Sequence, residues 1–511
     1  MALRSRTTKT KPAVRCESAT APLVAGSTAR ARRSAISTPQ ADTTLQTVLN
    51  RLAEADEYCV DVETSGLDWR HNAIVGYVFT FGPAPQDSYY VPFRHAGRSN
   101  VGGREGLKSP TGWKGDVLPG ERELIKAADR QGITAFGHNL AFDLRFLSRV
   151  GFTMKPRFED TMINEPLLDE YTKYSLEACA VRHGVQAKKG TSLYSYMADK
   201  LNLPNDKNIM SHFWRLSGDD PQAVEYAAGD GTSTWQLRDA QMDQIRFQGL
   251  DLVHSVESRL ISVLARMMVR GVHIDEERLG AIIADVDRQA EILLNEFPSG
   301  FNALSPDDVR RWMEKHGHTD WPRTKPTKNR PDGSPSFTEK YLKTHDAGRK
   351  ILELRKLNNL NSSFCVPLRD EHVWNGRVHT TFNQLRNDEY GTVTGRLSSN
   401  GPNLQQVPKH NEELGRLIRS VYVPDFGLWG ERDYSQIEPR LMAYYTRARV
   451  FLDDYRNNPK ADSHTAVAKD ARPDWDQMSK EEQKHFRNTW AKRVNQTVIT
   501  GGGKNALMHK Y

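Results

Sequence analysis

The pattern of hydrophobic and polar positions divides the chain into segments of different predicted secondary structure. Between residues 46 and 250, short runs rich in Val, Tyr and Phe alternate with segments of helical spacing. Helices are predicted from about residue 46 and over Leu140–Val150, where Gly151 ends the second one. Strands that alternate with helices predict an α/β domain here. The predicted strands are Tyr58–Glu63, Ile74–Phe81, Ser88–Phe93 and Ile133–Phe136, and a Gly-rich surface loop is predicted over Arg94–Gly120.

The middle of the chain is mainly helical in pattern. Residues Val263–Arg270 predict an amphipathic helix that ends at Gly271, and core packing explains its apolar positions. Residues 276–375 continue the helical pattern around a Pro- and Lys-rich loop, Trp321–Pro335. The basic residues of this loop can reach phosphate groups, although a solvated charge run is the commoner explanation for any one of them. They are Arg323, Lys325, Lys328 and Arg330.

Near the C-terminal end, an apolar pair is followed by an acidic residue. Leu428 and Trp429 precede Asp433, and apolar residues then recur at helical spacing. This pattern predicts a short strand that ends in a carboxylate, followed by a helix whose apolar face carries Ile437, Leu441 and Tyr444. A carboxylate at a strand end can hold a divalent metal against a phosphate, but it is more often a turn or cap residue.

Composition indicates a soluble, multidomain protein. The 511 residues are enough for about three domains. The hydrophobic fraction of 38% and the charged fraction of 26% are ordinary for a globular chain. No apolar run reaches about eighteen residues, so no membrane span is expected. The four cysteines are isolated, which favours a reducing compartment over a disulfide framework or a cysteine zinc site; they are Cys16, Cys59, Cys179 and Cys365.

The net charge of +7 comes from the N-terminal end. Of the 71 basic and 64 acidic residues, eight basic residues and one acid lie within residues 1–40, so the remainder is formally neutral. Nucleic-acid affinity of the remainder must therefore come from local basic patches. The Ser-, Thr-, Ala- and Arg-rich segment 1–45 is typical of a disordered tail that binds phosphate backbones. An organellar transit peptide has a similar composition, but nothing else in the sequence favours an organelle.

Four carboxylates in the α/β region have a spacing that suggests chemistry. Asp61 and Glu63 are two residues apart on a predicted strand, so both side chains leave the same face. Tyr226 and Asp230 are one helical turn apart, and Asp143 lies in the predicted helix after the fourth strand. Each carboxylate alone is more often a surface residue. Four of them at one site repel one another unless cations neutralise them, as in a two-metal phosphodiesterase.

These residues belong to three motifs: DVET at 61–64, GHNLAFD at 137–143 and YAAGD at 226–230. Together, over residues 46–250, they resemble the DEDD 3′–5′ exonucleases, tyrosine subclass, of proofreading polymerases. The resemblance implies an active two-metal nuclease in which Asp61, Glu63, Asp143 and Asp230 bind metal. It also implies that Tyr226 orients the water, that Leu67 packs against the terminal nucleotide and that Asn139 contacts the substrate. Matches at Asp160-Thr161-Met162 and Ser175-Leu176 are interpreted as structural.

Three further strings are TGRLSS at 394–399, PNLQ at 402–405 and DYSQIE at 433–438. In sequence and order they resemble family A DNA polymerases. The resemblance implies that Asp433 binds both catalytic metals, and that Arg396 and Gln405 lie near the primer terminus. It also implies that Glu438 blocks the ribose 2′-hydroxyl and so favours deoxynucleotides, whereas Gln436 is a structural support or a ribose-side contact.

Pro439 departs from the family, which usually has an apolar residue with a backbone donor at this position. If Ser435 capped the helix, Pro439 would remove the first donor of the hydrogen-bond ladder and crowd the Ser435 carbonyl. A helix start one or two residues later avoids this conflict. The placement of Glu438 depends on which start is used.

The segment 451–511 resembles the fingers of the same family. Asp462 and His464 match one fingers motif, and Arg487–Gly501 matches the helix that receives the incoming triphosphate. The family places Arg four residues before Lys, whereas Arg487 lies five before Lys492, with Asn488 at the Arg position. Gln496 and Thr500 replace an aromatic residue and a tyrosine, which should weaken stacking on the base and template. The implied substrate-binding residues are His464, Arg487 and Lys492.

The palm of the family also needs a second carboxylate, on a hairpin beyond the fingers helix. That hairpin is usually written His-Asp-Glu, and it is not found before Tyr511; the similar pair His345-Asp346 lies ahead of Asp433. One palm aspartate cannot hold two metals in line for nucleotidyl transfer. The expectation is therefore either a fragment or a split polymerase that a C-terminal polypeptide completes.

The sequence thus predicts a multidomain α/β protein with a ribonuclease H-like exonuclease domain, a helical thumb and the N-terminal part of a right-hand palm and fingers. The predicted function is DNA-directed DNA synthesis with proofreading, in the cytoplasm of a phage-infected bacterium. The alternatives are a stand-alone Mg²⁺-dependent exonuclease and a non-catalytic primer–template scaffold. The expected ligands are two Mg²⁺ per site (Mn²⁺ also suits them), primer–template DNA, single-stranded 3′ ends and deoxynucleoside triphosphates. The predicted parts are tail 1–45, exonuclease 46–250, thumb 251–375, palm 376–450 and fingers 451–511.

Overall fold

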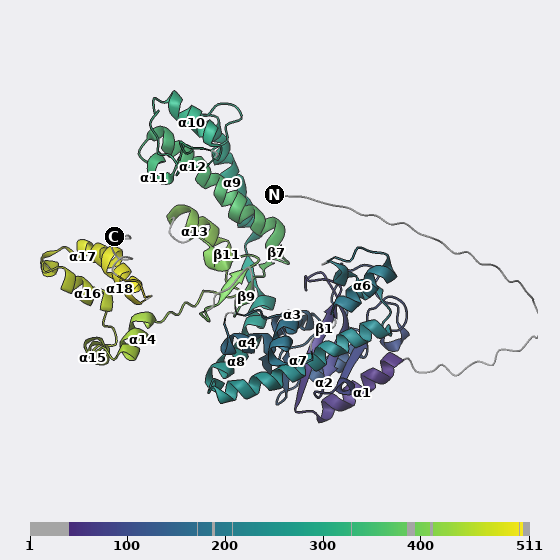
Figure 1. Ribbon diagram of the computed structural model, residues 1–511. Helices are drawn as coiled ribbons and strands as arrows, with labels where there is room; N and C mark the ends of the chain where they lie inside the picture. The colour runs from purple at the N-terminus through teal and green to yellow at the C-terminus, as the bar shows by residue number, and fades with distance from the viewer. Residues whose placement is uncertain are drawn as a thin grey trace, which may run out of the picture. The chain divides into compact units, whose positions relative to one another are not determined.

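The computed structural model divides the chain into two compact units, Met1–Val423 and Pro424–Tyr511 (Figure 1). The boundary falls inside the predicted palm, 376–450. The predicted tail, 1–45, lies largely outside the described residues, but its last part begins helix α1, Gln40–Glu54. The residues that the structure describes are 40–170, 172–186, 190–206, 208–328, 330–385, 394–408, 412–499 and 501–503.

A five-stranded sheet organises the first part of unit one. Its strand order is β3-β2-β1-β4-β5, so β1 lies in the centre, antiparallel to β2 and parallel to β4. The four predicted strands are present, and the short, charged strand β5 was not predicted. The strands are β1 Glu57–Thr64, β2 Ile74–Thr80, β3 Ser88–Pro92, β4 Thr134–Gly137 and β5 Arg157–Asp160.

The two faces of β1 are covered by different helices. Tyr58, Val60 and Val62 belong to one core, which also includes residues of α1, α2 (Glu121–Ala128) and α3 (Leu140–Arg149). Cys59 lies on the opposite face and packs with Phe136 and with Trp235 of α7 (Pro221–Phe247). Because side chains alternate along a strand, Asp61 and Glu63 share the face of Cys59 and point toward α7. The other helices of this region are α4 Thr161–Leu168, α5 Leu176–His183 and α6 Gly190–Leu201.

The predicted surface loop Arg94–Gly120 is only partly at the surface, because its first residue is buried. The Arg94 guanidinium donates to the two carboxylate oxygens of Glu121, at 2.6 and 2.7 Å, and to the Ile74 carbonyl. The Tyr77 hydroxyl also donates to Glu121. This ion pair joins α2 to the sheet, with side chains that are only 6% and 0% exposed.

The rest of unit one is mainly helical, with a second core of its own. The predicted helix before Gly271 is confirmed within α8, Asp251–Arg270, and Gly271 follows it with φ 62°. A small sheet has the order β11-β6-β8-β7, and β9 pairs with β10. These elements are β6 Val272–Ile274, α9 Glu276–Leu294, α10 Pro306–Lys315, α11 Glu339–Leu342, α12 Asp346–Leu360, β7 Val373–Trp374, β8 Arg377–Val378, β9 Thr381–Asn383, β10 Ser398–Asn400, α13 Glu412–Ser420 and β11 Tyr422–Val423.

Unit two is helical in its described residues, so the predicted strand ending in Asp433 is wrong. A strand needs a neighbour to pair its backbone groups, and no described segment pairs with residues 428–433. The predicted apolar face of the next helix is also solvent-exposed, with Ile437, Leu441 and Tyr444 between 45% and 60% exposed. The helices are α14 Ile437–Thr446, α15 Arg449–Asn457, α16 Ser463–Ala471, α17 Lys480–Phe486 and α18 Lys492–Ile499.

Across the described residues of both units, no helix combines the length and the apolar character needed to cross a membrane.

Candidate functional site

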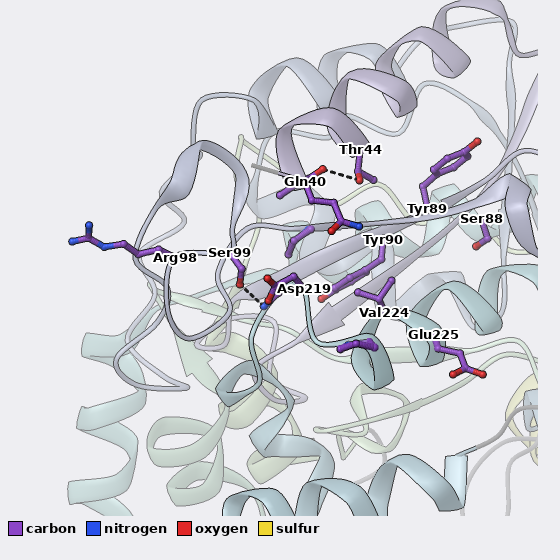
Figure 2. Close-up of a pocket in the computed structure, with 14 residues that line it drawn as sticks. Gln40, Thr44, Ser88, Tyr89, Tyr90, Arg98, Ser99, Asp219, Val224 and Glu225 are labelled. Carbon is purple, nitrogen blue, oxygen red and sulfur yellow. Dashed lines mark hydrogen bonds between the residues drawn. The ribbon is translucent and has the colours of Figure 1, made fainter. Parts of the chain in front are cut away.

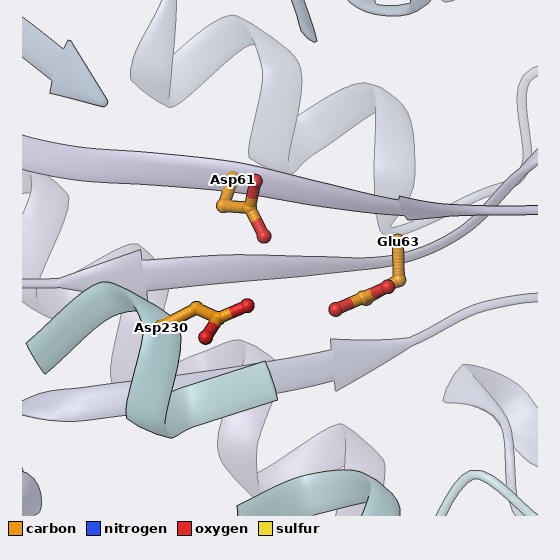
Figure 3. A group of neighbouring side chains, drawn as sticks. All are labelled: Asp61, Glu63 and Asp230. Carbon is orange, nitrogen blue, oxygen red and sulfur yellow. The ribbon is translucent and has the colours of Figure 1, made fainter. Parts of the chain in front are cut away.

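Three carboxylates meet between the central strand and the long helix of the sheet region (Figure 3). Asp61 and Glu63 come from β1, and Asp230 comes from α7. One oxygen from each can be chosen so that all lie within 4.8 Å of one another. Three carboxylates at this separation repel one another, and an all-oxygen donor set suits Mg²⁺ or Mn²⁺. The group therefore fits a divalent metal.

Asp143, the fourth predicted ligand, lies beside this group without being one of its three members. It is buried at the start of α3, and its carboxylate accepts a 3.0 Å hydrogen bond from the Val62 amide, between Asp61 and Glu63. Burial and the nearby Asp61 charge raise the pKa of Asp143. Both effects would be offset by a bound cation. Asp143 therefore lies next to the carboxylate group, and metal binding by Asp143 stays a prediction.

Asp61, Glu63 and Asp230 line a cavity of about 420 Å³, and Leu67 and Tyr226 line it as well. Leu67 is 84% exposed, so its side chain is available to a ligand in the cavity. Burial and the charges of Glu63 and Asp230 raise the pKa of Tyr226, which therefore keeps its hydroxyl proton. Some lining residues lie outside the quoted motifs and were not predicted from the sequence: Asn208, Met210 and Ser211. Phe142 also lines the cavity; it belongs to the motif at 137–143, but no role was predicted for it.

Asn139 lies on a different cavity, of about 280 Å³, and not with the carboxylates. Its backbone is left-handed, with φ 66°, at the start of α3. The Asp160 carboxylate holds this turn by accepting from the Asn139 and Leu140 amides, at 2.9 and 2.7 Å, and also caps α4. Burial raises the pKa of Asp160 to about 6 although several backbone amides lower it. The structural interpretation of Asp160 agrees with these contacts, and substrate contact by Asn139 stays a prediction.

A cavity of about 700 Å³ lies between the first turn of α1, strand β3 and the start of α7 (Figure 2). Gln40, Tyr90 and Glu225 are among its lining residues, and none of the predicted site residues belongs to it. It is larger than the carboxylate cavity but lacks a comparable group of metal-binding side chains among the described residues. The larger of these two cavities is therefore not the one that carries the candidate metal-binding residues.

The predicted primer-terminus residues lie in unit one and belong to one connected segment. Arg396 is exposed in the turn that precedes β10. The Gln405 side chain donates a 3.1 Å hydrogen bond to the Leu397 carbonyl, directly after Arg396. The two residues are therefore close, on the segment that pairs with β9.

Asp433 lies in unit two and is exposed. Among the described residues it does not belong to a group of three close carboxylates. Gln436 is instead fixed by α16: its side chain donates to the Ala461 carbonyl and accepts from the Ser463 amide, each at 2.9 Å. These contacts support the structural alternative for Gln436.

Pro439 lies in the first turn of α14, because the helix begins at Ile437 with Gln436 as the preceding cap residue. This start is one residue later than a Ser435 cap would give, as the sequence argument requires. In the first turn a backbone amide has no partner within the helix, so Pro439 removes no ladder bond. Glu438 consequently lies in the same turn, half-buried.

The predicted fingers residues form a connected set in unit two. Asp462 caps α16, where His464 is buried, and its carboxylate forms an ion pair with Arg487. His464 contacts the Asn495 side chain at 2.9 Å. Burial lowers the pKa of His464, which favours the neutral ring. The contacts link α16 to the helix that carries Lys492.

A π-helical turn, Arg487–Ala491, joins α17 to α18 and removes the register difference found in the sequence. The Lys492 amide donates to the Arg487 carbonyl, five residues earlier. A π turn contains one residue more than an α turn, so residues five apart occupy the places of residues four apart. Arg487 therefore takes the position relative to Lys492 that the sequence spacing gave to Asn488. Lys492 and Gln496 are exposed, and Thr500 lies outside the described residues.

Two protein-family models match successive parts of the chain. The family model for 3′-5′ exonucleases matches residues 36–246, and that for DNA polymerase family A matches residues 275–511. The chain therefore belongs to family A of the DNA polymerases and carries a 3′–5′ exonuclease domain ahead of its polymerase region.

Several relatives come from phages. The DNA-directed DNA polymerase of Pseudomonas phage M6 is 30% identical over 81% of this chain and 64% of its own length. DNA polymerase DpoZ of Acinetobacter phage SH-Ab 15497 is 28% identical over 80% of this chain and 65% of its own. The chain thus spans slightly less than two thirds of these relatives.

A solved structure shares the fold: the POL domain of Pol1 from M. smegmatis, in complex with DNA primer-template and dNTP. It has a TM-score of 0.63 and 21% sequence identity, and the match covers 91% of this chain and 72% of that one.

Proposed function

We propose that this chain hydrolyses the 3′ ends of DNA at the site formed by Asp61, Glu63, Asp143 and Asp230. The observation that carries the proposal is the convergence of carboxylates from β1 and α7 in one cavity. A two-metal hydrolase needs its carboxylate ligands this close together, on the two sides of the cavity. The exonuclease domain that the chain carries supplies the reaction class.

Each side chain has a definite task in this reaction. The four carboxylates would hold Mg²⁺ or Mn²⁺, which activates water and neutralises charge at the phosphate when bound. Tyr226 keeps its proton, because burial raises its pKa, and donates a hydrogen bond that orients the attacking water. Leu67 contacts the terminal base through its exposed side chain.

The polymerase region is proposed to copy primer–template DNA from deoxynucleoside triphosphates, as part of a complete polymerase. Arg487, Lys492 and His464 would bind the triphosphate, Asp433 would bind metal and Glu438 would exclude ribonucleotides. Arg396 and Gln405 would contact the primer end. This part is supported by the fingers contacts of unit two and by the π turn that aligns Arg487 with Lys492.

The phage relatives support the cytoplasm of an infected bacterium as the place of action. They give no support to the organellar interpretation of the basic tail.

One labelled primer–template tests both parts. With Mg²⁺ and no nucleotides, we expect the primer to shorten from its 3′ end; EDTA should stop the reaction and Mn²⁺ restore it, because the carboxylates alone supply no electrophile. Adding nucleotides and a candidate C-terminal polypeptide should convert shortening into extension. Shortening that survives EDTA would reject the metal mechanism. No extension at any concentration of the polypeptide would reject the synthetic role, and DNA binding without cleavage would favour a scaffold.

Gly231, next to Asp230, should be essential for the position of α7. A Cβ atom here would lie 2.1 Å from the Thr80 hydroxyl and 2.9 Å from atoms of Ser88 and Val78, so the helix must move away from the sheet. Because a misplacement of about 1 Å can lower a rate about a hundredfold, we expect Gly231→Ala to lower the rate of 3′-end cleavage by roughly that factor.

The control for Gly231→Ala is Gly229→Ala in the same helix. A Cβ atom at Gly229 meets nothing within 4 Å, so this variant should cleave normally. Because alanine stabilises a helix relative to glycine, the variant should also unfold at a slightly higher temperature than the original chain. Equal cleavage rates in both variants would show that α7 and the sheet can separate without cost to the site.

A further inference from the structure

A two-residue hairpin of the polymerase region reaches the exonuclease domain. Strands β7 and β8 are joined by Asn375 and Gly376, with φ of 51° and 73°, the backbone that a tight hairpin turn requires. Trp374 ends β7, and His379 follows β8. Both belong to the segment matched by the polymerase family model.

The rings of this hairpin pack against a tryptophan of the exonuclease domain. Trp69, only 7% exposed, lies edge-on to Trp374 and to His379, with centroid distances of 5.6 and 5.3 Å. The His379 ring is itself fixed by a 2.9 Å contact between Nδ1 and the Met268 carbonyl. Edge-to-face pairs of this kind contribute stabilisation beyond their buried area. The contact is therefore specific in its geometry.

Arg149, at the end of α3, ties the same group to the helix that carries Asp143. Its guanidinium donates to the Trp69 and Arg70 carbonyls, at 2.9 and 2.6 Å. It also lies 5.6 Å from the centroid of the Trp374 ring. The hairpin, the exonuclease loop and α3 thus meet at one point.

Trp69 belongs to the loop Ser65–Asn72, which carries Leu67 into the carboxylate cavity. Leu67 has no packing of its own to fix it, since its side chain is 84% exposed. The loop is held from within by Asp68, whose carboxylate accepts from Arg70 and contacts His71 at 2.8 Å. Ser65 and Asn72, at the two ends of the loop, donate hydrogen bonds to the Pro110 carbonyl, at 2.6 and 2.9 Å. Between these ends the ring of Trp69 is buried, and the polymerase hairpin packs against that ring.

We propose that Trp374 and His379 are positioning residues for the exonuclease, because they hold the loop Ser65–Asn72 with Leu67 facing the 3′ end of a DNA strand. This inference rests on the proposed nuclease function. It makes the polymerase region part of the apparatus that orients the substrate, although its hairpin supplies none of the proposed metal ligands. The effect should appear in substrate binding more than in the chemical step.

The test uses the full chain and compares Trp374→Ala with Trp374→Phe and Trp321→Ala. In Trp374→Ala, loss of the ring contacts should raise KM for single-stranded DNA about tenfold with a smaller change in kcat. Trp374→Phe keeps an aromatic ring and should therefore keep KM close to that of the original chain. Trp321 packs on Phe337, away from this group, and controls for the loss of a tryptophan. In a Leu67→Ala background, Trp374→Ala should have no further effect on KM. Additive losses would overturn the proposal.

A second readout does not depend on nuclease activity. Amide hydrogen exchange over residues 65–72 should accelerate about tenfold in Trp374→Ala and stay unchanged in Trp321→Ala. Unchanged exchange in Trp374→Ala would overturn the positioning role even if the chain is an active nuclease. Faster exchange in a chain without metal-dependent cleavage would instead reject the proposed function and leave the loop anchor established.

Discussion

Replacing Asp230 with asparagine is expected to slow the cleavage of DNA 3′ ends about a thousandfold. The asparagine has the same shape, but it removes one negative charge from a group whose oxygens lie within 4.8 Å of one another. A lost metal ligand removes several kcal/mol of charge stabilisation, and each 1.36 kcal/mol corresponds to a factor of ten. Single-turnover degradation of a labelled single strand at saturating Mg²⁺ measures the effect directly.

The matched control for Asp230→Asn is Asp243→Asn, further along the same helix. The Asp243 side chain is 81% exposed and forms an ion pair with Arg246, one turn away. Surface substitutions of this kind change stability by at most about 0.5 kcal/mol, so cleavage should continue at the original rate. An Asp230→Asn variant that also cleaves normally would place the active site elsewhere.

The grouping of side chains in the candidate nuclease site could be partly predicted from the sequence, because some of its geometry is local. The two-residue period of β1 alone places Asp61 and Glu63 on one face, and the helical turn alone places Tyr226 beside Asp230. That α7 covers this face of the sheet does not follow from either period. It depends on contacts such as the close approach of Gly231 to Thr80, between segments far apart in the chain. From the sequence, only the motif resemblance indicated that the residues of β1 and those of α7 belong to one site.

The polymerase region shows where sequence patterns are insufficient. The strand predicted before Asp433 has apolar residues in the right order, but a strand also needs a neighbour, and local pattern does not show whether one is present. For Arg487 and Lys492, the residue spacing indicated a departure from the family that depends on the type of helix. A count of five residues assumes an α-helix, and the π turn changes what that count means. The Trp69–Trp374 contact joins two family regions and leaves no periodic signal in either.

Replacing Glu121 with alanine is expected to destabilise the exonuclease domain by about 3–5 kcal/mol. The carboxylate is fully buried and accepts from the Arg94 guanidinium, the Tyr77 hydroxyl and the Leu118 amide. Its removal leaves a charged guanidinium that is 6% exposed without its counter-ion, together with a buried hydroxyl that has lost its acceptor. For a domain of this size, the first thermal transition should fall by about 10 °C or more in a circular dichroism melt.

Two further variants test whether the loss of stability comes from breaking the buried ion pair or from any substitution in α2. Glu123→Ala removes an exposed carboxylate of the same helix and should leave the transition within a degree or two of the original. Replacing both Arg94 and Glu121 with methionine removes the charge as well as its partner, and it should melt above Glu121→Ala because no uncompensated ion stays buried. Recovery should be partial, since Tyr77 and Leu118 still lack their acceptor. If the double variant melts below Glu121→Ala, the other hydrogen bonds of Arg94, to the Ile74 and Asp116 carbonyls, matter more than its charge.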